Sequence, residues 1–142
     1  MKKILIVVDY QNDFVNPNGA LPVPNAINIV DNIQSRIDSD EYSARIYTFD
    51  THTAATYKGS PEEAIFPIHC EYGTEGWKFY NIKPIQWEAF EEVFEQEFID
   101  VPFEQASIND EYFFTKDVFN IGMVMLIIQN GLKKNSLLMN TK

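Results

Sequence analysis

A run of five apolar residues near the start of the chain constrains the fold more than any other feature. Residues Ile4 to Val8 are isoleucine, leucine and valine without interruption, which is the pattern of a strand buried on both faces of a parallel sheet. A second strand is predicted over 44–49. Between the two, an apolar stripe at helical spacing predicts a helix that begins at about Asn25, whose side chain can cap it. The stripe consists of Ala26, Ile27, Val30, Ile33 and Ile37. Strand, helix and strand in this order form a βαβ unit and predict an α/β fold.

The rest of the chain extends this pattern within one domain. A length of 142 residues is that of a single domain with its own core. Residues 51–80 are rich in glycine, threonine and proline, and an irregular stretch of that length is usually functional. Residues 84–98 predict an amphipathic helix with an acidic face, and 111–115 predict a third strand that ends at Lys116. The segment 121–142 is apolar at first and then polar.

Charge and cysteine content restrict the partners and the compartment. The formal net charge is −10 and the pI is about 4.5, so we expect neither nucleic acid nor a membrane surface as a partner. The single cysteine, Cys70, rules out an internal disulfide framework and is typical of a reducing compartment. The apolar run before Asp9 is shorter than a secretory signal needs, and the stretch 121–128 is shorter than a membrane span. These features predict a soluble, cytoplasmic protein.

Three charged residues stand at the ends of the predicted strands. Asp9 follows the first strand, Asp50 the second, and Lys116 the third. Ligands of open parallel sheets bind beyond the carboxyl ends of the strands, so these side chains are expected to converge although they are far apart in the sequence. Strand ends also carry ordinary capping or solvent-facing charges, and position alone leaves both interpretations open.

The two histidines of the chain, together with Asp50, suggest a metal site. His52 lies two residues after Asp50, so an extended backbone points both side chains to the same side, and His69 could complete the set. One aspartate and two histidines are the ligands of an open catalytic metal site, and this set fits several divalent ions. The alternative is that both histidines are plain loop residues.

Other residues near these positions have a functional and a structural interpretation. Cys70 follows His69 and could be a nucleophile, although a lone cysteine is more often a small buried apolar residue. Residues 73–76, Gly-Thr-Glu-Gly, suggest a phosphate cradle but lack the lysine that follows in such loops, and a turn explains them better. Phe14 and Trp77 are candidate substrate-binding residues, and core positions are the alternative for both.

Four blocks of the sequence resemble the nicotinamidase and isochorismatase-like cysteine hydrolases. They are Asp9-Tyr10-Gln11-Asn12-Asp13-Phe14 with Gly19-Ala20-Leu21-Pro22-Val23, Thr48-Phe49-Asp50-Thr51-His52, Phe66-Pro67-Ile68-His69-Cys70 with residues 73–76, and Phe114-Thr115-Lys116-Asp117. The resemblance runs from residue 4 to about residue 120, in the order of the family. The Asp-x-His pair followed by a later histidine favours the nicotinamidase branch.

The resemblance implies a fold, a reaction and a set of roles. The fold would be a doubly wound, Rossmann-like parallel sheet with helices on both faces, its C-terminal strands missing or altered. The reaction would be hydrolysis of nicotinamide or a related small amide to acid and ammonia through a cysteine acyl-enzyme. Asp9 would transfer the proton, Lys116 would hold Asp9 ionised, and Phe14 would stack on the substrate ring.

The resemblance also implies a divalent metal, with zinc first and iron or manganese as alternatives. The metal would orient the pyridine nitrogen of the substrate. Its ligands would be Asp50, His52 and His69.

One part of the family pattern is not found. The family's nucleophilic cysteine follows the strand after the lysine block, at a helix N-terminus that also forms the oxyanion hole. The residues after Lys116 contain no cysteine, and Cys70 corresponds to the position beside the metal ligand. We therefore expect the chain to end before the nucleophile and to have little or no amidase activity. A non-catalytic metal- or ligand-binding module and a prematurely terminated gene product are the alternatives. A sheet without its last strands exposes an edge, so we also expect a homo-oligomer.

Overall fold

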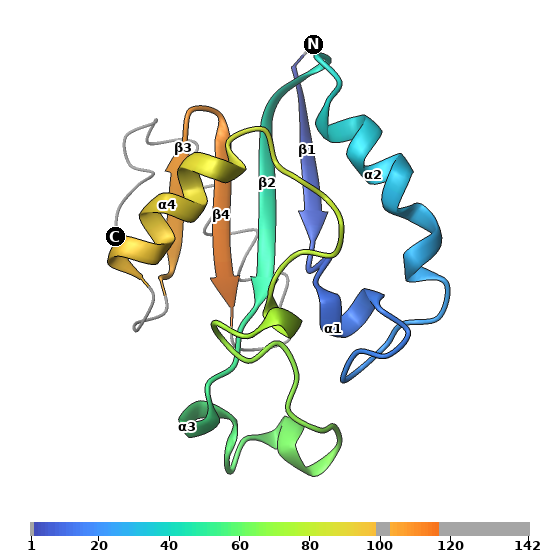
Figure 1. The fold of residues 1–142 in the computed structure, drawn as a ribbon, viewed down its shortest axis with the longest axis vertical. Coiled ribbons are helices and arrows are strands. Elements are labelled where there is room, and N and C mark those ends of the chain that lie inside the picture. The colour runs from blue at the N-terminus through green and yellow to red at the C-terminus, as the bar shows by residue number, and fades with distance from the viewer. Residues whose placement is uncertain (1, 99–102, 117–142) are drawn as a thin grey trace.

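The computed structural model describes residues 2–98 and 103–116. The predicted α/β class is confirmed: four strands form one sheet in the order β1-β2-β4-β3, with helices packed against it (Figure 1). The strands are β1 (Lys3–Val8), β2 (Tyr42–Asp50), β3 (Gln105–Ile108) and β4 (Glu111–Lys116). The α-helices are α1 (Asn12–Val15), α2 (Val30–Ile37), α3 (Ala54–Tyr57) and α4 (Trp87–Glu97), and the 3-10 turns are η1 (Ala26–Ile29), η2 (Pro61–Ala64) and η3 (Glu75–Trp77). The tail 121–142 lies outside the described residues.

The three strands that the sequence predicts are parallel to one another. Strand β2 pairs with β1 on one side and with β4 on the other. The fourth strand, β3, runs antiparallel to β4 and was not predicted. It is only four residues long, too short for an alternating pattern to stand out, and Asn109, with φ of 53°, makes the tight turn that joins it to β4.

The region before α2 differs from the sequence-based expectation. Asn25 does not cap the helix: its backbone is left-handed, with φ of 67°, and its side chain makes no capping hydrogen bond. The chain instead enters through the 3-10 turn η1, and the α-helix begins only at Val30. The apolar stripe still points inward, because Val30, Ile33 and Ile37 all join the main core.

The main core of the described residues lies on one face of the sheet and is built largely from aromatic rings. A smaller cluster consists of Ile46 and Phe114 with Ile6 and Tyr112 packed against them. Phe49 of β2 stacks on Phe79 and Trp77 with ring centroids 4.4 and 4.5 Å apart, and Phe90 of α4 stacks on Phe113 of β4 at 4.1 Å. Burying each such ring stabilises the fold by about 1.5–3 kcal/mol. Both α2 and α4 contribute to this core. Any helix on the opposite face lies outside the described residues.

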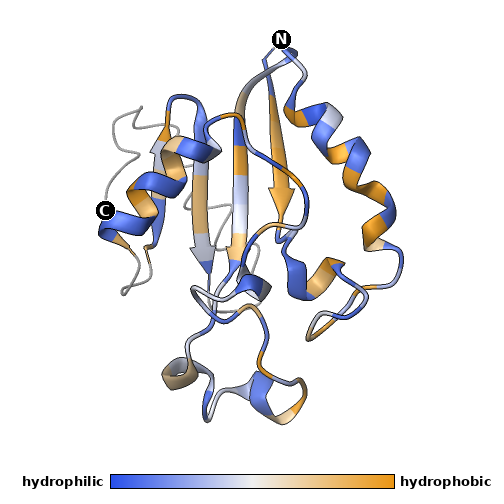
Figure 2. Ribbon diagram, in the orientation of Figure 1, coloured by the Kyte–Doolittle hydropathy of each residue, from blue (hydrophilic) through white to orange (hydrophobic). Residues whose placement is uncertain are grey.

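Amphipathic patterning explains why α4 packs there. Hydrophobic and hydrophilic residues alternate along the helix (Figure 2). Phe90 and Phe94 are buried, whereas the neighbouring Glu91, Glu92 and Glu95 are half-buried or exposed. The helix predicted within 84–98 and its acidic outer face are thus confirmed, and the helix itself runs from Trp87 to Glu97.

Among the described residues, no helix combines the length and the apolarity that a bilayer crossing requires.

The irregular segment 51–80 lies beyond the carboxyl ends of β2 and β4 (Figure 1). It carries α3, η2 and η3 but no strand among its own residues. One isolated bridge, between Gln11 and Phe79, fixes it to the rest of the molecule, and a second, between His52 and Glu71, joins two parts of the segment itself. The chain therefore places its longest irregular stretch where the sequence predicts a functional site.

Candidate metal centre

The strand register brings Asp9, Asp50 and Lys116 to one edge of the sheet. Asp50 and Lys116 are direct partners in the β2–β4 pairing. Asp9 follows β1, and its N–H donates to the carbonyl of Thr48 at 3.1 Å. Because parallel strands end on the same side, three residues that are distant in sequence meet. The convergence that the sequence predicts is present in the structure.

Lys116 bridges the two carboxylates. Its Nζ lies 2.7 Å from Oδ2 of Asp9 and 3.5 Å from Oδ1 of Asp50. Burial lowers the pKa of Lys116, but the charges of Asp9 and Asp50 outweigh it and the net effect raises the pKa. The ammonium group therefore stays protonated, and Thr48 completes the cluster by donating its hydroxyl to Oδ1 of Asp9 at 2.6 Å.

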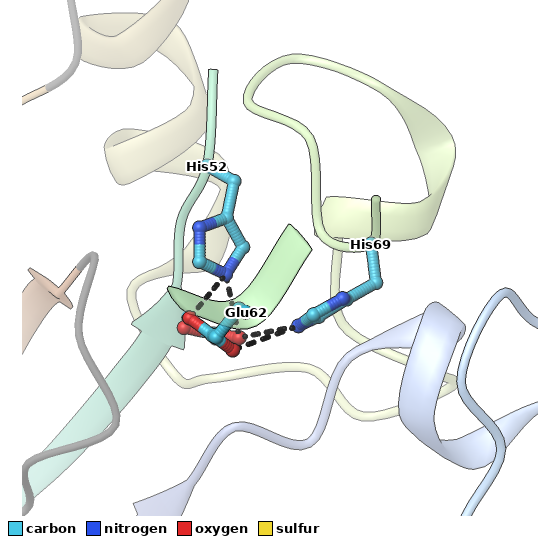
Figure 3. A group of neighbouring side chains, drawn as sticks. His52, Glu62 and His69 are labelled. Atoms are coloured by element: carbon cyan, nitrogen blue, oxygen red, sulfur yellow. Dashed lines mark hydrogen bonds and ion pairs between the residues drawn. The ribbon is translucent and has the colours of Figure 1, made fainter. Parts of the chain in front are cut away.

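The second oxygen of Asp50 faces both histidines. Oδ2 of Asp50 lies 3.3 Å from Nε2 of His52 and 3.3 Å from Nε2 of His69. Glu62 faces the same two nitrogens: its Oε1 lies 3.7 Å from Nε2 of His52, and its Oε2 lies 3.7 Å from Nε2 of His69. Figure 3 shows the two imidazole rings and the Glu62 carboxylate pointing toward one another from separate segments. Asp50, His52, Glu62 and His69 each offer one ligand atom, and these atoms all lie within 4.8 Å of one another.

This arrangement fits a small divalent cation. Ligand atoms of a tetrahedral zinc site, with bonds of about 2.0–2.2 Å, are separated by about 3.4 Å. The four distances between the histidine nitrogens and the carboxylate oxygens, two of 3.3 Å and two of 3.7 Å, are close to that spacing. Two nitrogens and two carboxylate oxygens are also the donor types that such an ion accepts. The residues present therefore fit the metal that the resemblance implies.

Backbone contacts set the direction of both imidazole rings. His69 donates from Nδ1 to the carbonyl of Pro67 at 2.8 Å, which leaves Nε2 facing the cluster. The N–H of His52 donates to the carbonyl of Cys70 at 3.0 Å, and the N–H of Tyr72 donates back to the carbonyl of His52 at 2.8 Å. The segment after His69 is thus aligned beside the segment after Asp50.

Glu62 is a site residue that sequence reasoning missed. It lies in η2, where Ser60 caps the turn by accepting from the N–H of Glu63 and Pro61 occupies the first position. A glutamate in the first turn of a helix is favoured by the helix dipole alone, so the sequence gives no sign that it faces the histidines. Only the path of the 58–69 segment brings its carboxylate to His52 and His69.

The electrostatics keep Asp50 ionised. Burial raises the pKa of the Asp50 carboxyl group, but hydrogen bonds with His52 and His69 and the charge of Lys116 outweigh it, so the pKa falls well below its usual range. For His69, burial lowers the pKa, but the interactions with Asp50 and with the Pro67 carbonyl raise it by more. The net pKa of His69 is raised in the metal-free chain. Asp50 is therefore available as an anionic ligand.

Gln11 holds the end of β2 in place. Its side-chain amide is fully buried. It donates to the carbonyl of Asp50 at 2.9 Å and accepts from the N–H of Asp50 at 2.8 Å, and it also donates to the carbonyl of Trp77. The Gln11 side chain thus bonds the backbone of Asp50 in the way that a neighbouring strand would. Sequence reasoning missed it, because an amide in a turn-rich segment has no distinguishing pattern.

The two predicted substrate-binding residues lie in different environments. The Phe14 ring is half-buried and lies 5.5 Å, between ring centroids, from the ring of His69. Trp77 is only 1% exposed, stacks within the core, and donates its indole N–H to the hydroxyl of Thr51 at 2.9 Å. Phe14 thus borders the cluster, whereas Trp77 supports the strand end from the core. The predicted contact of Trp77 with a substrate stays a prediction, and the burial of the Trp77 side chain counts against that contact.

Cys70 and the 73–76 segment match their structural interpretations. The Cys70 side chain is fully buried, and burial, with the charge of Asp50 next, raises the pKa of its thiol far above the usual range. Gly73 has φ of 84°, and the N–H of Thr74 donates to the carbonyl of Glu71, so the segment forms a turn. Neither feature adds a nucleophile or a phosphate site.

No family model matches the sequence, and no curated protein matches it by sequence. Solved structures do match. The nicotinamidase/pyrazinamidase from Bacillus subtilis is 25% identical, with a TM-score of 0.55 over 91% of this chain and 67% of that chain. A second B. subtilis nicotinamidase structure gives 25% identity and a TM-score of 0.56 over 91% of this chain and 66% of that chain. The pyrazinamidase of Pyrococcus horikoshii, in complex with zinc, is 23% identical, with a TM-score of 0.60 over 92% and 66% of the two chains.

These structural neighbours confirm the resemblance found in the sequence. The chain has the α/β fold of the nicotinamidases and pyrazinamidases. It spans about two thirds of the length of the structures that it matches.

Proposed function

We propose that this chain is a metal-binding, nicotinamidase-like amidohydrolase domain that binds a small aromatic amide beside Asp9 and Lys116. The observation that carries the proposal is the meeting of Asp50, His52, Glu62 and His69 around one point, with every ligand atom within 4.8 Å of the others. A solved structure with the same fold, the P. horikoshii pyrazinamidase, is a zinc complex. Zinc is the proposed ion, with iron or manganese as alternatives.

The residues around this site have different proposed roles in binding and in proton transfer. A bound cation would act as a Lewis acid for a ring nitrogen or a water molecule. Phe14 borders His69 and supplies an apolar wall against which a flat ring can pack. Nζ of Lys116 lies 2.7 Å from Oδ2 of Asp9, and Asp9 is the proposed group that accepts a proton and returns it to the leaving amine. Asp50 contacts Lys116 with one oxygen and both histidines with the other, and it therefore couples the two halves of the site.

Turnover by the 142-residue chain is expected to be low. Amide hydrolysis through an acyl-enzyme needs a thiolate that reaches the carbonyl carbon. The one cysteine of this sequence is Cys70, and it is buried with a raised pKa. This burial also favours the second candidate function, a domain that binds the metal and the amide without hydrolysing it.

Ligand titration tests the binding part of the proposal. We expect the zinc-loaded chain to bind nicotinamide more tightly than benzamide, which has the same shape but no ring nitrogen, and we expect chelation to abolish the difference. Calorimetry measures both affinities. Equal affinity for the two amides, with or without zinc, would remove the ring-nitrogen interaction from the proposal.

A matched pair of variants tests the metal ligands. Glu62 and Glu63 are neighbours in η2, but only Glu62 faces the histidines. We expect Glu62→Gln to weaken zinc binding by about tenfold or more, since one charged oxygen ligand is lost, and Glu63→Gln to leave it unchanged. Equilibrium dialysis gives both affinities, and equal zinc content in the two variants would exclude Glu62 as a ligand.

An ammonia-release assay tests turnover. We expect a turnover number below about 0.01 s⁻¹ with nicotinamide and zinc, which is far below the ordinary range of enzyme turnover numbers. A rate near 1 s⁻¹ would show that the chain contains a working nucleophile, and would refute the non-catalytic alternative.

A further inference from the structure

Asp13 is a charged residue near the cluster that neither the metal centre nor the ion pair uses. It lies in α1, and its carboxylate accepts hydrogen bonds from two backbone N–H groups, one of them 57 positions away in the sequence. Oδ2 accepts from the N–H of Cys70 at 2.8 Å, and Oδ1 accepts from the N–H of Ala20 at 3.1 Å. Its own carbonyl accepts from the N–H of Leu21 at 3.0 Å. One residue therefore ties together the loop after α1 and the loop that carries His69.

Two glycines surround Asp13 and make room for it. A Cβ on Gly76 would overlap the Asp13 carboxylate, and a Cβ on Gly19 would lie 2.5 Å from the Asp13 carbonyl oxygen and 2.7 Å from its Cα. Neither glycine has the positive φ that would otherwise explain its presence. The absence of a side chain at both positions is thus explained by the close approach of Asp13.

Cys70, whose N–H donates to Asp13, connects the two histidines through the backbone. Cys70 directly follows His69 and has a left-handed backbone with φ of 50°, which costs a non-glycine residue about 1–3 kcal/mol unless its neighbours hold it. Its N–H is held by Asp13 and its carbonyl accepts from the N–H of His52 at 3.0 Å. The turn at Cys70 redirects the chain immediately after His69, so it determines where the His69 ring points.

We propose that Asp13 is a positioning residue for the metal centre: by holding the Cys70 amide it keeps His69 directed at Asp50 and His52. The inference rests on the proposed metal-binding function. The carboxylate of Asp13 accepts from the backbone N–H of Cys70, so it acts on His69 through the backbone of residue 70. The ring of the next residue, Phe14, packs on His69, so the same short helix holds the histidine from two sides.

Asp13→Asn is the first test, with Asp40→Asn as its matched control. The asparagine keeps the shape but places an NH₂ group against one of the two N–H donors, whereas Asp40 is exposed and precedes β2 at the opposite end of the sheet. In the metal-free chain, we expect amide hydrogen exchange at Cys70 or Ala20 to be at least about tenfold faster in Asp13→Asn. In cobalt titrations, we expect about tenfold weaker binding and an altered visible spectrum, as is typical of residues that orient ligands. The control should change neither.

Gly76→Ala tests the same contact from the other side and keeps the carboxylate. The new methyl group displaces Asp13, so we expect the same faster exchange at Cys70 and the same loss of cobalt affinity. In an Asp13→Ala background the methyl group has room, and Gly76→Ala should then have no further effect on either measurement. If Asp13→Asn does not fold, Gly76→Ala carries the test alone.

The outcomes separate this inference from the proposed function. Cobalt binding by the unmodified chain, with unchanged affinity, spectrum and Cys70 exchange in both variants, would overturn the role of Asp13 and leave the metal centre standing. A chain that binds no cobalt would overturn the metal centre, and the exchange measurement on the metal-free protein would still decide whether Asp13 holds residue 70. Effects of equal size in Asp40→Asn would also overturn the inference, because they would follow from charge alone.

Discussion

The β2–β4 strand pair carries buried charges at both of its ends, and the two ends use them differently. At the carboxyl end, Asp50 is paired with Lys116, and at the amino end Arg45 is paired with Glu111. All four side chains are largely buried. The carboxyl-end charges contact other ionisable side chains, whereas the amino-end charges are satisfied mainly by backbone groups.

The amino-end pair fastens two helices to the sheet. Glu111 accepts from the N–H groups of Ile85 and Gln86, at 3.1 and 2.6 Å, just before α4 begins. Arg45 donates to the carbonyls of Ile37 and Ser39 at the end of α2. A negative charge at a helix start and a positive charge at a helix end are both favoured by the helix dipole. These charges therefore stabilise the fold.

The comparison shows that burial of a charge does not by itself mark a functional site. In the described part of the chain every buried side-chain nitrogen and oxygen has a hydrogen-bond partner, so the presence of a partner does not distinguish the two ends either. The two ends differ in which groups those partners are. Carboxylates that face a lysine and two histidines can exchange protons or bind an ion, whereas charges that face backbone groups and one tyrosine hydroxyl hold these groups in place.

The largest expected effect is on stability, at the amino end. Glu111→Ala leaves the hydroxyl of Tyr47 and two backbone N–H groups without their acceptor. We expect the free energy of unfolding to fall by about 3–5 kcal/mol, measured by urea denaturation of the metal-free chain. Zinc affinity below the unfolding transition should stay the same. A loss of zinc affinity as large as that from removing a ligand would mean that the two ends are not separable.

The next effect is on metal binding, at the carboxyl end. We expect His69→Ala to weaken zinc binding more than about 100-fold, which corresponds to about 2.7 kcal/mol, and to destabilise the metal-free chain less than Glu111→Ala does. Competition with a chromophoric chelator measures the affinity. Unchanged metal content in His69→Ala would refute the metal centre and, with it, the distinction between the ends.

The amino end also gives a pH dependence. Burial, followed by the hydrogen bond to Glu111, raises the pKa of Tyr47 above its usual value of 10. Above pH 10 the unfolded chain loses this proton while the folded chain keeps it, so stability falls as pH rises, by about 1.4 kcal/mol per pH unit for this tyrosine. Thermal unfolding between pH 9 and 11 should show a smaller slope in Tyr47→Phe. Equal slopes in both proteins would mean that Tyr47 ionises as readily folded as unfolded.

The smallest expected effect concerns the side edge of the sheet. Among the described strands β1 pairs with β2 alone, and its Ile4 and Val8 side chains are 44% and 49% exposed. We propose that two copies of the chain associate through this edge. Light scattering should give a dimer for the chain and a larger monomer fraction for Ile4→Lys. A monomer at moderate concentration without the substitution would count against this proposal.

Local patterns in the sequence determined much of the fold. The strands β1 and β2 and the apolar stripe of α4 follow from residue type and spacing, because burial of a face needs only the correct period. The convergence of Asp9, Asp50 and Lys116 follows from the same source, since parallel strands must end together. The short strand β3 and the left-handed Asn25 were not predicted, because four residues or one turn carry too little pattern.

Only the tertiary structure decided which residues complete the site. Glu62, Gln11 and Asp13 lie in or beside four-residue helices that are too short to show a periodic pattern. Hydrogen bonds join Gln11 to residues 39 and 66 positions away in the sequence, and Asp13 to a residue 57 positions away. The same is true of the difference between Glu111 and Asp50, two acids on neighbouring strands. Sequence spacing determines which side of a strand an acid faces, but the partner that meets it there depends on how distant loops pack.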